Sequence, residues 1–106
     1  NIFNRVIINL FNNAIIFSDQ IKVIIDVNNQ IIKINIHDNG PGISQEEKEN
    51  VFKPFYRIDK SRNQNYGNSG LGLSVTKSLL SQINGTITLK DSFLGGLDVE
   101  LQIENK

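Results

Sequence analysis

The chain contains no cysteine, so it can form neither a disulfide framework nor a thiolate metal site, which fits a reducing compartment. An excess of either charge is also missing, because 11 Lys and Arg residues balance 11 Asp and Glu residues. This balance gives no electrostatic reason to expect a nucleic-acid partner. Charges interrupt every apolar run before it is long enough to span a membrane, and neither end carries a signal peptide, transit peptide or lipidation motif. A soluble protein is therefore expected.

The length of 106 residues and a hydrophobic content of 39% predict one small globular domain without internal repeats. The sequence begins at Asn1, without Met and with an apolar run already under way, which indicates a fragment of a longer protein. Any targeting signal or membrane segment is then expected outside this sequence.

Residues 2–17 are predicted to form a helix, because apolar residues recur there at spacings of three and four. These are Phe3, Val6, Ile7, Leu10, Phe11 and Ala14. A polar row of Arg5, Asn9 and Asn13 runs along a helix that is otherwise apolar nearly all round.

Alternation of apolar and polar residues predicts four strands, at 21–27, 31–38, 86–90 and 97–103. The first two are joined by a tight turn at Asn28–Asn29, residue types that tolerate a positive φ. Such strands form an antiparallel sheet with helices on one face, so the expected fold is an α+β two-layer sandwich.

A second helix is predicted over 70–83, with Asn84 and Gly85 as its stop signal. Between sheet and helix, residues 39–69 show no sustained period apart from a short helical patch at 45–51. A stretch this long inside a small domain is interpreted as a functional lid.

Strand parity draws attention to Asp38, which falls on the helix-covered face together with Ile32, Ile34 and Ile36. A carboxylate there needs a partner, because burying an unpaired charge is costly. One partner is the backbone of the Asn39–Gly40 turn, and the other is an amino group of a flat ligand inserted between sheet and helices. His37 has the opposite parity and is predicted to be an ordinary exposed strand residue.

Two groups of glycines admit two interpretations each. Gly40 and Gly42 follow Asp38 and either form a simple turn or let a ligand approach the backbone. Gly70 and Gly72 lie in the first turn of the second helix, where glycine lowers helix propensity. They either allow close packing on the sheet or leave room for a phosphate at the helix N-terminus.

Asn9 and Asn13 carry amide oxygens that suit Mg²⁺, although asparagine pairs on helices are more often solvated. In the lid, aromatic residues alternate with basic residues. The basic side chains could screen phosphate charge, while the aromatic side chains equally suit an apolar cluster that anchors the loop. These residues are Phe52, Lys53, Phe55, Tyr56, Arg57, Lys60 and Arg62.

Four motifs in this order resemble those of the ATP-binding catalytic domain of bacterial sensor histidine kinases, in the superfamily of gyrase, Hsp90 and MutL ATPases with the Bergerat fold. NLFNNA at 9–14 is similar to the N box, DNGPGI at 38–43 to the G1 box, FKPFYR at 52–57 to the F box and GNSGLGL at 67–73 to the G2 box. The resemblance covers almost the whole chain, with the catalytic domain over residues 1–106 and an ATP lid at about 39–69. The strand and helix that usually precede the N box are missing, which predicts an unpaired sheet edge.

The resemblance implies a role for each matching residue. Asp38 would bind the adenine amino group, Asn13 would coordinate Mg²⁺, and Asn9 would lie near the phosphates or the metal, which makes both asparagines catalytic. The remaining nucleotide-binding residues would be Gly40, Gly42 and Ile43 on the adenine side, Tyr56 and Arg57 in the lid, and Ser69, Gly70, Leu71, Gly72 and Leu73 at the phosphates.

By the same resemblance, the domain would transfer the γ-phosphoryl group of Mg-ATP to a histidine on a separate dimerisation domain of a homodimeric, two-component kinase. A response regulator would be the next partner, and the location would be cytoplasmic, which includes the cytoplasmic portion of an inner-membrane sensor. His37, on a strand of the nucleotide domain, is not a credible acceptor. Asn9 stands where related ATPases carry a Glu general base, so phosphotransfer is favoured over hydrolysis.

Alternatives stay open within and outside the superfamily. Serine kinases of the anti-sigma type share much of this architecture. A degenerate nucleotide-binding or protein interaction module is suggested by Ile16, which stands where family members commonly carry a phosphate-contacting Lys.

Overall fold

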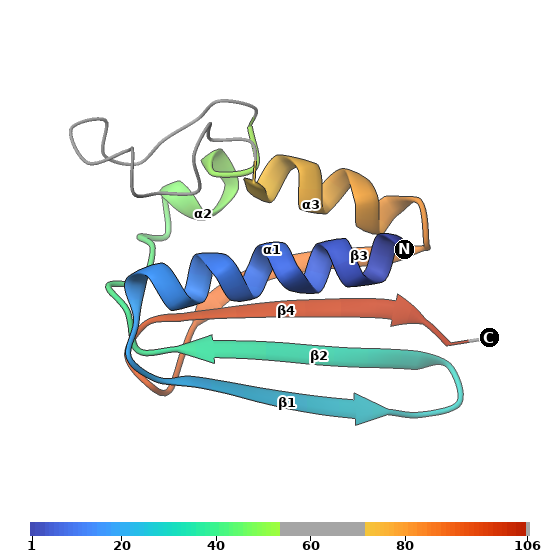
Figure 1. Cartoon of the computed structure of the whole chain (residues 1–106), viewed down its shortest axis with the longest axis horizontal. Coiled ribbons are helices and arrows are strands. Elements are labelled where there is room, and N and C mark those ends of the chain that lie inside the picture. The colour runs from blue at the N-terminus through green and yellow to red at the C-terminus, as the bar shows by residue number, and fades with distance from the viewer. Residues whose placement is uncertain (54–71, 106) are drawn as a thin grey trace.

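The computed structural model describes residues 1–53 and 72–105. Its elements follow the order α1 (Ile2–Phe17), β1 (Ile21–Val27), β2 (Ile31–Asp38), α2 (Glu47–Asn50), α3 (Gly72–Ser81), β3 (Gly85–Asp91) and β4 (Leu97–Glu104) (Figure 1). Two helices, α1 and α3, lie over one face of a single sheet, and the short α2 lies on the same side, near the end of the sheet where β2 ends.

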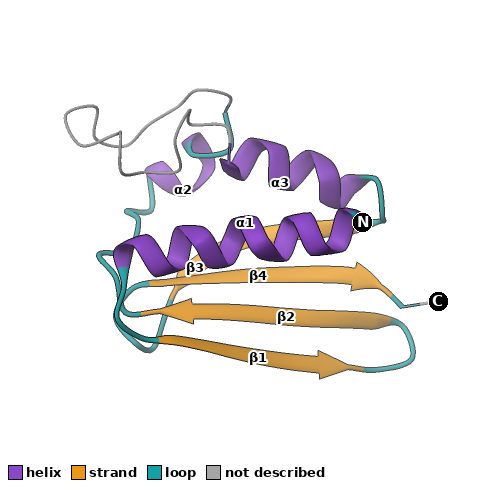
Figure 2. Ribbon diagram, in the orientation of Figure 1, coloured by secondary structure: helices purple, strands orange, loops and turns teal. Residues whose placement is uncertain are grey.

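The sheet has the strand order β1-β2-β4-β3, and all three neighbouring pairs are antiparallel (Figure 2). The register places Ile36 between Val23 and Val99, and His37 between Lys22 and Asp98. Neighbours in register point to the same face, so Ile36 and His37 define an inner face toward the helices and an outer face away from them. The end of β2 at Asp38 therefore belongs to the inner face.

The hydrophobic core lies between the inner face and the two long helices. Val6 and Leu10 contribute from α1, Leu79 and Leu80 from α3, and Leu101 from the middle of β4. The fully buried Thr76 also faces this layer. The apolar spacing of α1 is thus explained, because one face of the helix fills the core. Asn1 caps the first turn by accepting a hydrogen bond from the Asn4 amide.

The predicted elements are confirmed with small shifts of their ends: β3 and β4 are longer than expected, and α3 ends at Ser81. Asn84 takes the left-handed conformation expected after that helix, with φ 57°. The β1–β2 turn is closed differently from expectation. Among the described residues Asn84 alone combines a positive φ with a side chain, and Asn28 closes the turn by accepting bonds from the Gln30 and Ile31 amides.

Strand β1 forms one edge of the sheet. Its inner-face residues Ile25 and Val27 are 61% and 63% exposed, because the helices do not reach over this edge. Ile8 and Ile15 on α1 are similarly exposed, which agrees with a helix that is apolar nearly all round. In the part of the chain that the structure describes, no helix is long and apolar enough to cross a membrane.

Candidate functional site

Asp38 is buried at the carboxyl end of β2, with 8% of its surface exposed. Its Oδ1 atom accepts hydrogen bonds from the backbone N–H of Gly40, at 2.9 Å, and of Leu97, at 3.1 Å. The backbone partner expected from the sequence is therefore present. Within residues 1–53 and 72–105, no hydrogen bond reaches the other oxygen, Oδ2. One carboxylate oxygen is thus fixed by the fold, and the other stays able to accept from a ligand.

The glycines around Asp38 are needed by the protein itself. A Cβ on Gly40 would lie 2.8 Å from the Phe17 carbonyl oxygen, and Gly42 has a φ of +73°. Gly96, in the loop between β3 and β4, is packed still more closely, because a Cβ there would lie 2.2 Å from Asp38 Oδ1. The turn interpretation of Gly40 and Gly42 thus has direct support, and the same close packing leaves this edge of the site lined by backbone.

Asn9 and Asn13 lie on α1, and Asn13 is one helical turn before Phe17, whose carbonyl meets Gly40. Both asparagines are half-buried. Neither side-chain amide hydrogen-bonds within the described residues. The polar row predicted from the sequence is thus available to bind a ligand from the helix layer. Ile16, where a phosphate-contacting Lys is common in the family, is 51% exposed.

A buried lysine holds the segment that follows Gly42. Lys48, on α2, is 6% exposed, and its Nζ atom donates to the Ile43 carbonyl at 2.7 Å and to Asp91 Oδ1 at 2.9 Å. The predicted site residue Ile43 is therefore tied to the end of β3. Phe52, which begins the F-box motif, lies under the ammonium group of Lys77 on α3, 5.0 Å from ring centroid to Nζ.

The remaining predicted site residues belong to the second glycine motif and the lid. Gly72 is the first residue of α3, and Leu73 follows it as a half-buried residue packed against the core. Tyr56, Arg57, Ser69, Gly70 and Leu71 lie outside the described residues.

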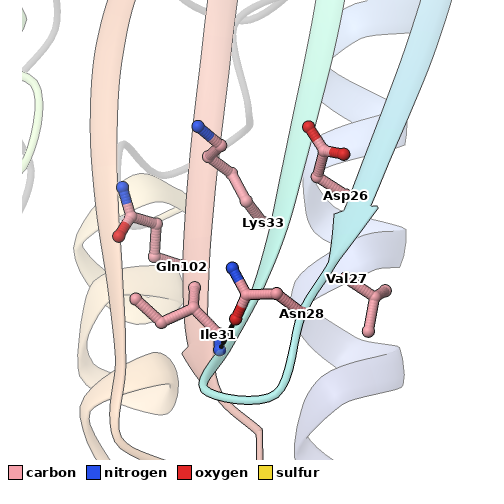
Figure 3. A pocket seen from close by; sticks show the side chains of 6 residues that line it. All are labelled: Asp26, Val27, Asn28, Ile31, Lys33 and Gln102. Atoms are coloured by element: carbon pink, nitrogen blue, oxygen red, sulfur yellow. Dashed lines mark hydrogen bonds between the residues drawn. The ribbon is translucent and has the colours of Figure 1, made fainter.

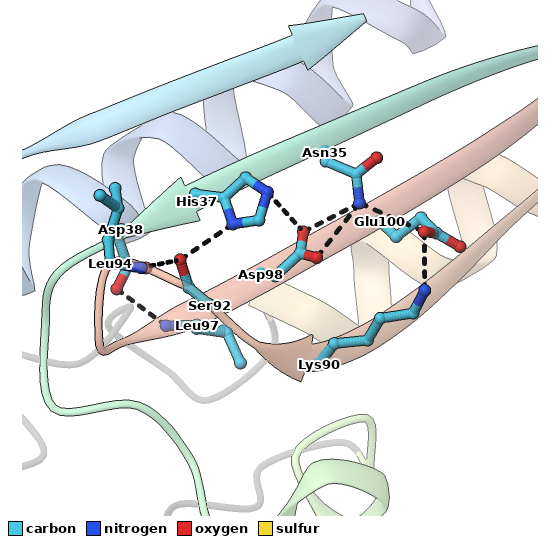
Figure 4. A network of polar contacts seen from close by, with 9 residues as sticks. All are labelled: Asn35, His37, Asp38, Lys90, Ser92, Leu94, Leu97, Asp98 and Glu100. Carbon is cyan, nitrogen blue, oxygen red and sulfur yellow. Dashed lines mark hydrogen bonds and ion pairs between the residues drawn. The ribbon is translucent and has the colours of Figure 1, made fainter. Parts of the chain in front are cut away.

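The prediction that His37 is exposed is wrong. The residue is on the outer face, as parity required, yet only 8% of its surface is exposed. Phe93, from the β3–β4 loop, covers the imidazole at 4.7 Å between ring centroids, and Ser92 and Asp98 flank it (Figure 4). Strand parity predicts that His37 lies on the outer face. It does not predict the burial of the imidazole, because Phe93 comes from a loop distant in the sequence.

The outer face carries a network of buried polar groups. Glu100 accepts hydrogen bonds from Lys90 at 2.8 Å, from Gln102 at 3.0 Å and from Asn35 at 3.2 Å. The hydrogen bond from Lys90 is the main cause that lowers the pKa of Glu100 to about 2, against the opposing effect of burial. The same bond raises the pKa of Lys90. Asn35 also donates to Asp98, so the network extends to His37 (Figure 4).

A shallow hollow of about 370 Å³ lies at the opposite end of the sheet from Asp38, beside the β1–β2 turn (Figure 3). It is lined by Asp26, Val27, Asn28, Ile31, Lys33 and Gln102. None of these residues was predicted to bind a ligand, and the hollow is separate from the site around Asp38.

The geometry thus combines a buried carboxylate with one available oxygen, a glycine-lined edge and two available amides on the covering helix. A family model for histidine kinase-, DNA gyrase B- and HSP90-like ATPases matches residues 1–106. The chain belongs to this family. The assignment confirms the resemblance carried by the four motifs, and it makes the open sheet with helices on one face the expected architecture of the ATPase domain.

Individual members of the family point to one branch. The sensor histidine kinase CpxA of Escherichia coli K12 is 40% identical over 90 residues, which are 84% of this chain and 20% of CpxA. The sensor protein CiaH of Streptococcus pneumoniae is 37% identical over 97 residues, 89% of this chain and 22% of CiaH. The nucleotide-free catalytic domain of histidine kinase ThkA has a TM-score of 0.82 and 25% identity, covering 98% of this chain and 67% of that domain.

Within this ATPase family, the chain is therefore an ATP-binding catalytic domain of the histidine kinase type. It spans about a fifth of the length of the curated relatives it matches.

Sequence reasoning missed two positions that shape the site, Lys48 and Gly96. Lys48 lies in a short patch rich in charged residues, which resembles a solvated helix face. Gly96 belongs to the pair Gly95–Gly96, which resembles the family's terminal glycine motif only in part, and its contact with Asp38 is apparent only in the fold.

Proposed function

We propose that this domain binds Mg-ATP through Asp38 and supplies the γ-phosphoryl group for phosphorylation of a histidine on a separate dimerisation domain. The observation that carries the proposal is the state of Asp38: Oδ1 is held by the Gly40 and Leu97 amides, and Oδ2 is left without a partner among the described residues. An acceptor held this way matches the exocyclic amino group of adenine, which donates hydrogen bonds.

The other proposed contacts follow the arrangement of the elements. Gly40, Gly42 and Ile43 would line the adenine side, where the backbone can approach a flat ring. The N-terminus of α3, with Gly72 and Leu73, would meet the phosphates, because a helix start offers N–H groups and a positive dipole end. Tyr56, Arg57, Ser69, Gly70 and Leu71 complete the proposed set from the lid and the second glycine motif.

Magnesium fits the amides of α1. Asn13, with Asn9 one turn earlier, presents a half-buried amide that the described residues leave without a hydrogen bond, and amide oxygens are hard donors suited to this cation. The ion would neutralise charge on the transferring phosphoryl group. This chain's own residues then position the nucleotide, with Asp38 fixing the base and α1 holding the amides at the phosphate end.

Transfer to a protein acceptor is proposed over hydrolysis because Asn9 cannot take a proton from water at the position where related ATPases carry Glu. The proposed partners are the dimerisation and phosphoacceptor domain of the same homodimeric kinase and a response regulator. A cytoplasmic location follows from the need for ATP.

The test is to incubate the chain with γ-labelled ATP, Mg²⁺ and the histidine-bearing dimerisation domain of the parent kinase. The expected product is an acid-labile, alkali-stable phosphoprotein, as a phosphohistidine would be. Acid-stable phosphate on a serine would instead indicate a serine kinase, and steady release of inorganic phosphate without the acceptor would indicate an ATPase. A folded chain that binds no nucleotide would leave the interaction-module alternative.

A further inference from the structure

His37 and Asp38 are consecutive residues of β2 and point to opposite faces of the sheet, yet both are bonded to the same loop. The loop comprises residues 92–96 and connects β3 to β4, which begins at Leu97. Ser92 lies 2.9 Å from Nδ1 of His37, and Leu97 donates its amide to Asp38 Oδ1 at 3.1 Å (Figure 4). The loop thus joins the outer-face histidine to the inner-face carboxylate.

Backbone hydrogen bonds link the two ends of this loop to each other and to Asp38. The Ser92 amide donates to the Gly96 carbonyl at 2.8 Å, and the Gly95 amide donates to the Ser92 carbonyl at 3.0 Å. Gly96 in turn donates to the Asp38 carbonyl at 3.1 Å. A continuous chain of contacts therefore leads from His37 through Ser92 and Gly96 to Asp38.

The Ser92 hydroxyl is the link at the histidine end. Its Oγ atom accepts from the Leu94 amide at 3.0 Å, so the hydroxyl proton is available to Nδ1 of His37. In that tautomer the Nε2–H group faces Asp98, 3.8 Å away. Phe93 covers the imidazole, and both His37 and Ser92 are at least nine-tenths buried. A hydrogen bond in such a place is protected from competing water.

We infer that His37 is a positioning residue for the nucleotide site. Through Ser92 it fixes the loop that holds Oδ1 of Asp38, and so keeps Oδ2 aimed at the adenine amino group. The inference rests on the proposed role of Asp38 in binding adenine. It adds that the preference for adenine over a 6-oxopurine depends on a residue of the opposite face, which does not touch the nucleotide.

The test compares the affinity of the full chain for ADP and for IDP, whose hypoxanthine base carries an oxygen in place of the amino group. His37→Leu removes both nitrogens, His37→Gln places an amide near the position of Nε2, and His37→Asn places one near that of Nδ1. Only the Asn variant retains the contact with Ser92. Ser92→Ala removes the same contact from the other side.

We expect His37→Leu, His37→Gln and Ser92→Ala each to lower the ADP-to-IDP affinity ratio about five-fold, the effect of one buried hydrogen bond. His37→Asn should stay within about two-fold of the parent protein, a difference near the limit of resolvable hydrogen-bond effects. Thermal unfolding of each variant gives the folded fraction, and a residue with a purely structural role would change that fraction without changing the ratio.

Asp38→Asn, measured beside these variants, separates the two claims. If Asp38→Asn lowers the ratio while His37→Leu and Ser92→Ala keep the parent value, the positioning role is overturned and the adenine role of Asp38 stands. If Asp38→Asn itself keeps the parent ratio, the adenine role of Asp38 and the positioning role of His37 are both overturned. A loss in His37→Asn equal to that in His37→Leu would also overturn the role assigned to the Ser92 contact.

Discussion

The two faces of the sheet differ in how their buried carboxylates are hydrogen-bonded. On the inner face, apolar residues such as Ile36, Val99 and Leu101 pack under the helices, and the buried carboxylate of Asp38 keeps one oxygen without a protein partner among the described residues. On the outer face no helix covers the strands, yet Asp98 and Glu100 are equally buried. There both oxygens of Asp98 accept from Asn35, and both oxygens of Glu100 accept from neighbouring side chains.

The difference separates a structural network from a binding group. A carboxylate surrounded by an amide donor and a lysine, like Glu100, has its acceptor capacity occupied by the protein. Asp38 instead receives two backbone donors on one oxygen alone. Among the buried carboxylates of the described residues, only Asp38 leaves an oxygen able to accept from a ligand.

The largest effect is expected from a substitution in the core under the inner face. Leu101→Ala removes a fully buried side chain from the middle of the core, which should lower the free energy of unfolding by about 2–5 kcal/mol. Thr88→Ala, on the exposed outer side of β3, should cost less than about 1 kcal/mol. Urea unfolding followed by circular dichroism measures both. Equal losses would mean that the core is not centred between β4 and the helices.

The next prediction concerns the loop against Asp38. Gly96→Ala would place a Cβ 2.2 Å from Asp38 Oδ1 and 2.6 Å from the Gly40 amide, so the loop must move away from the carboxylate. ADP affinity should fall more than about ten-fold, or roughly 1.4 kcal/mol.

Gly95→Ala is the matched control. Its Cβ would meet nothing within 4 Å, but its φ of +104° should cost about 1–2 kcal/mol of stability. Nucleotide affinity, measured by calorimetry on folded protein, should stay near the parent value. Loss of ADP binding in Gly95→Ala but not in Gly96→Ala would contradict the proposed contact.

The third prediction concerns the buried lysine beside the site. Lys48→Met keeps the aliphatic stem but removes the donor to the Ile43 carbonyl and to Asp91, which should cost about 1–3 kcal/mol of stability. Lys53→Met changes an exposed side chain in the same segment and should be nearly neutral. Thermal unfolding compares the two. Similar midpoints for both variants would show that the Lys48 contacts contribute little.

The smallest effect is expected on the outer face, in the pH dependence of the free energy of unfolding. The folded pKa of Glu100, about 2, lies below its ordinary value of 4.5, so the stability contributed by its carboxylate is present above pH 4.5 and is lost as pH falls toward 2. Glu100→Gln should therefore show a flatter dependence of unfolding free energy on pH across this window. Parallel curves for variant and parent would contradict the lowered pKa.

Much of this comparison was predictable from the sequence. The apolar spacing of residues 2–17 and the alternation in 31–38 gave the helix, the strand and the inner-face position of Asp38. Local periodicity carries that information because it reports which side of an element is buried. The order of the motifs along the chain then indicated the family, which is confirmed, and their residues predict the site.

Other features depend on contacts between distant segments, which no local pattern reveals. The burial of His37 requires Phe93 to fold over it, and the burial of Lys48 requires Asp91 at the end of β3. The close approach of Gly96 to Asp38 depends on the register of β2 with β4. These are tertiary effects, and they override the exposed character that each residue type suggests.

The central claim is that Asp38 reads adenine, and the most direct measurement is a calorimetric titration of the chain with ADP and Mg²⁺ beside Asp38→Asn. The Asn variant keeps an oxygen for the Gly40 and Leu97 amides but places an NH₂ group where Oδ2 stood, facing the adenine amino group. We expect ADP binding by the parent, a loss of at least about ten-fold in Asp38→Asn, and parent-like binding by Asp26→Asn on the outer face. Parent-like affinity in a folded Asp38→Asn variant would contradict the account.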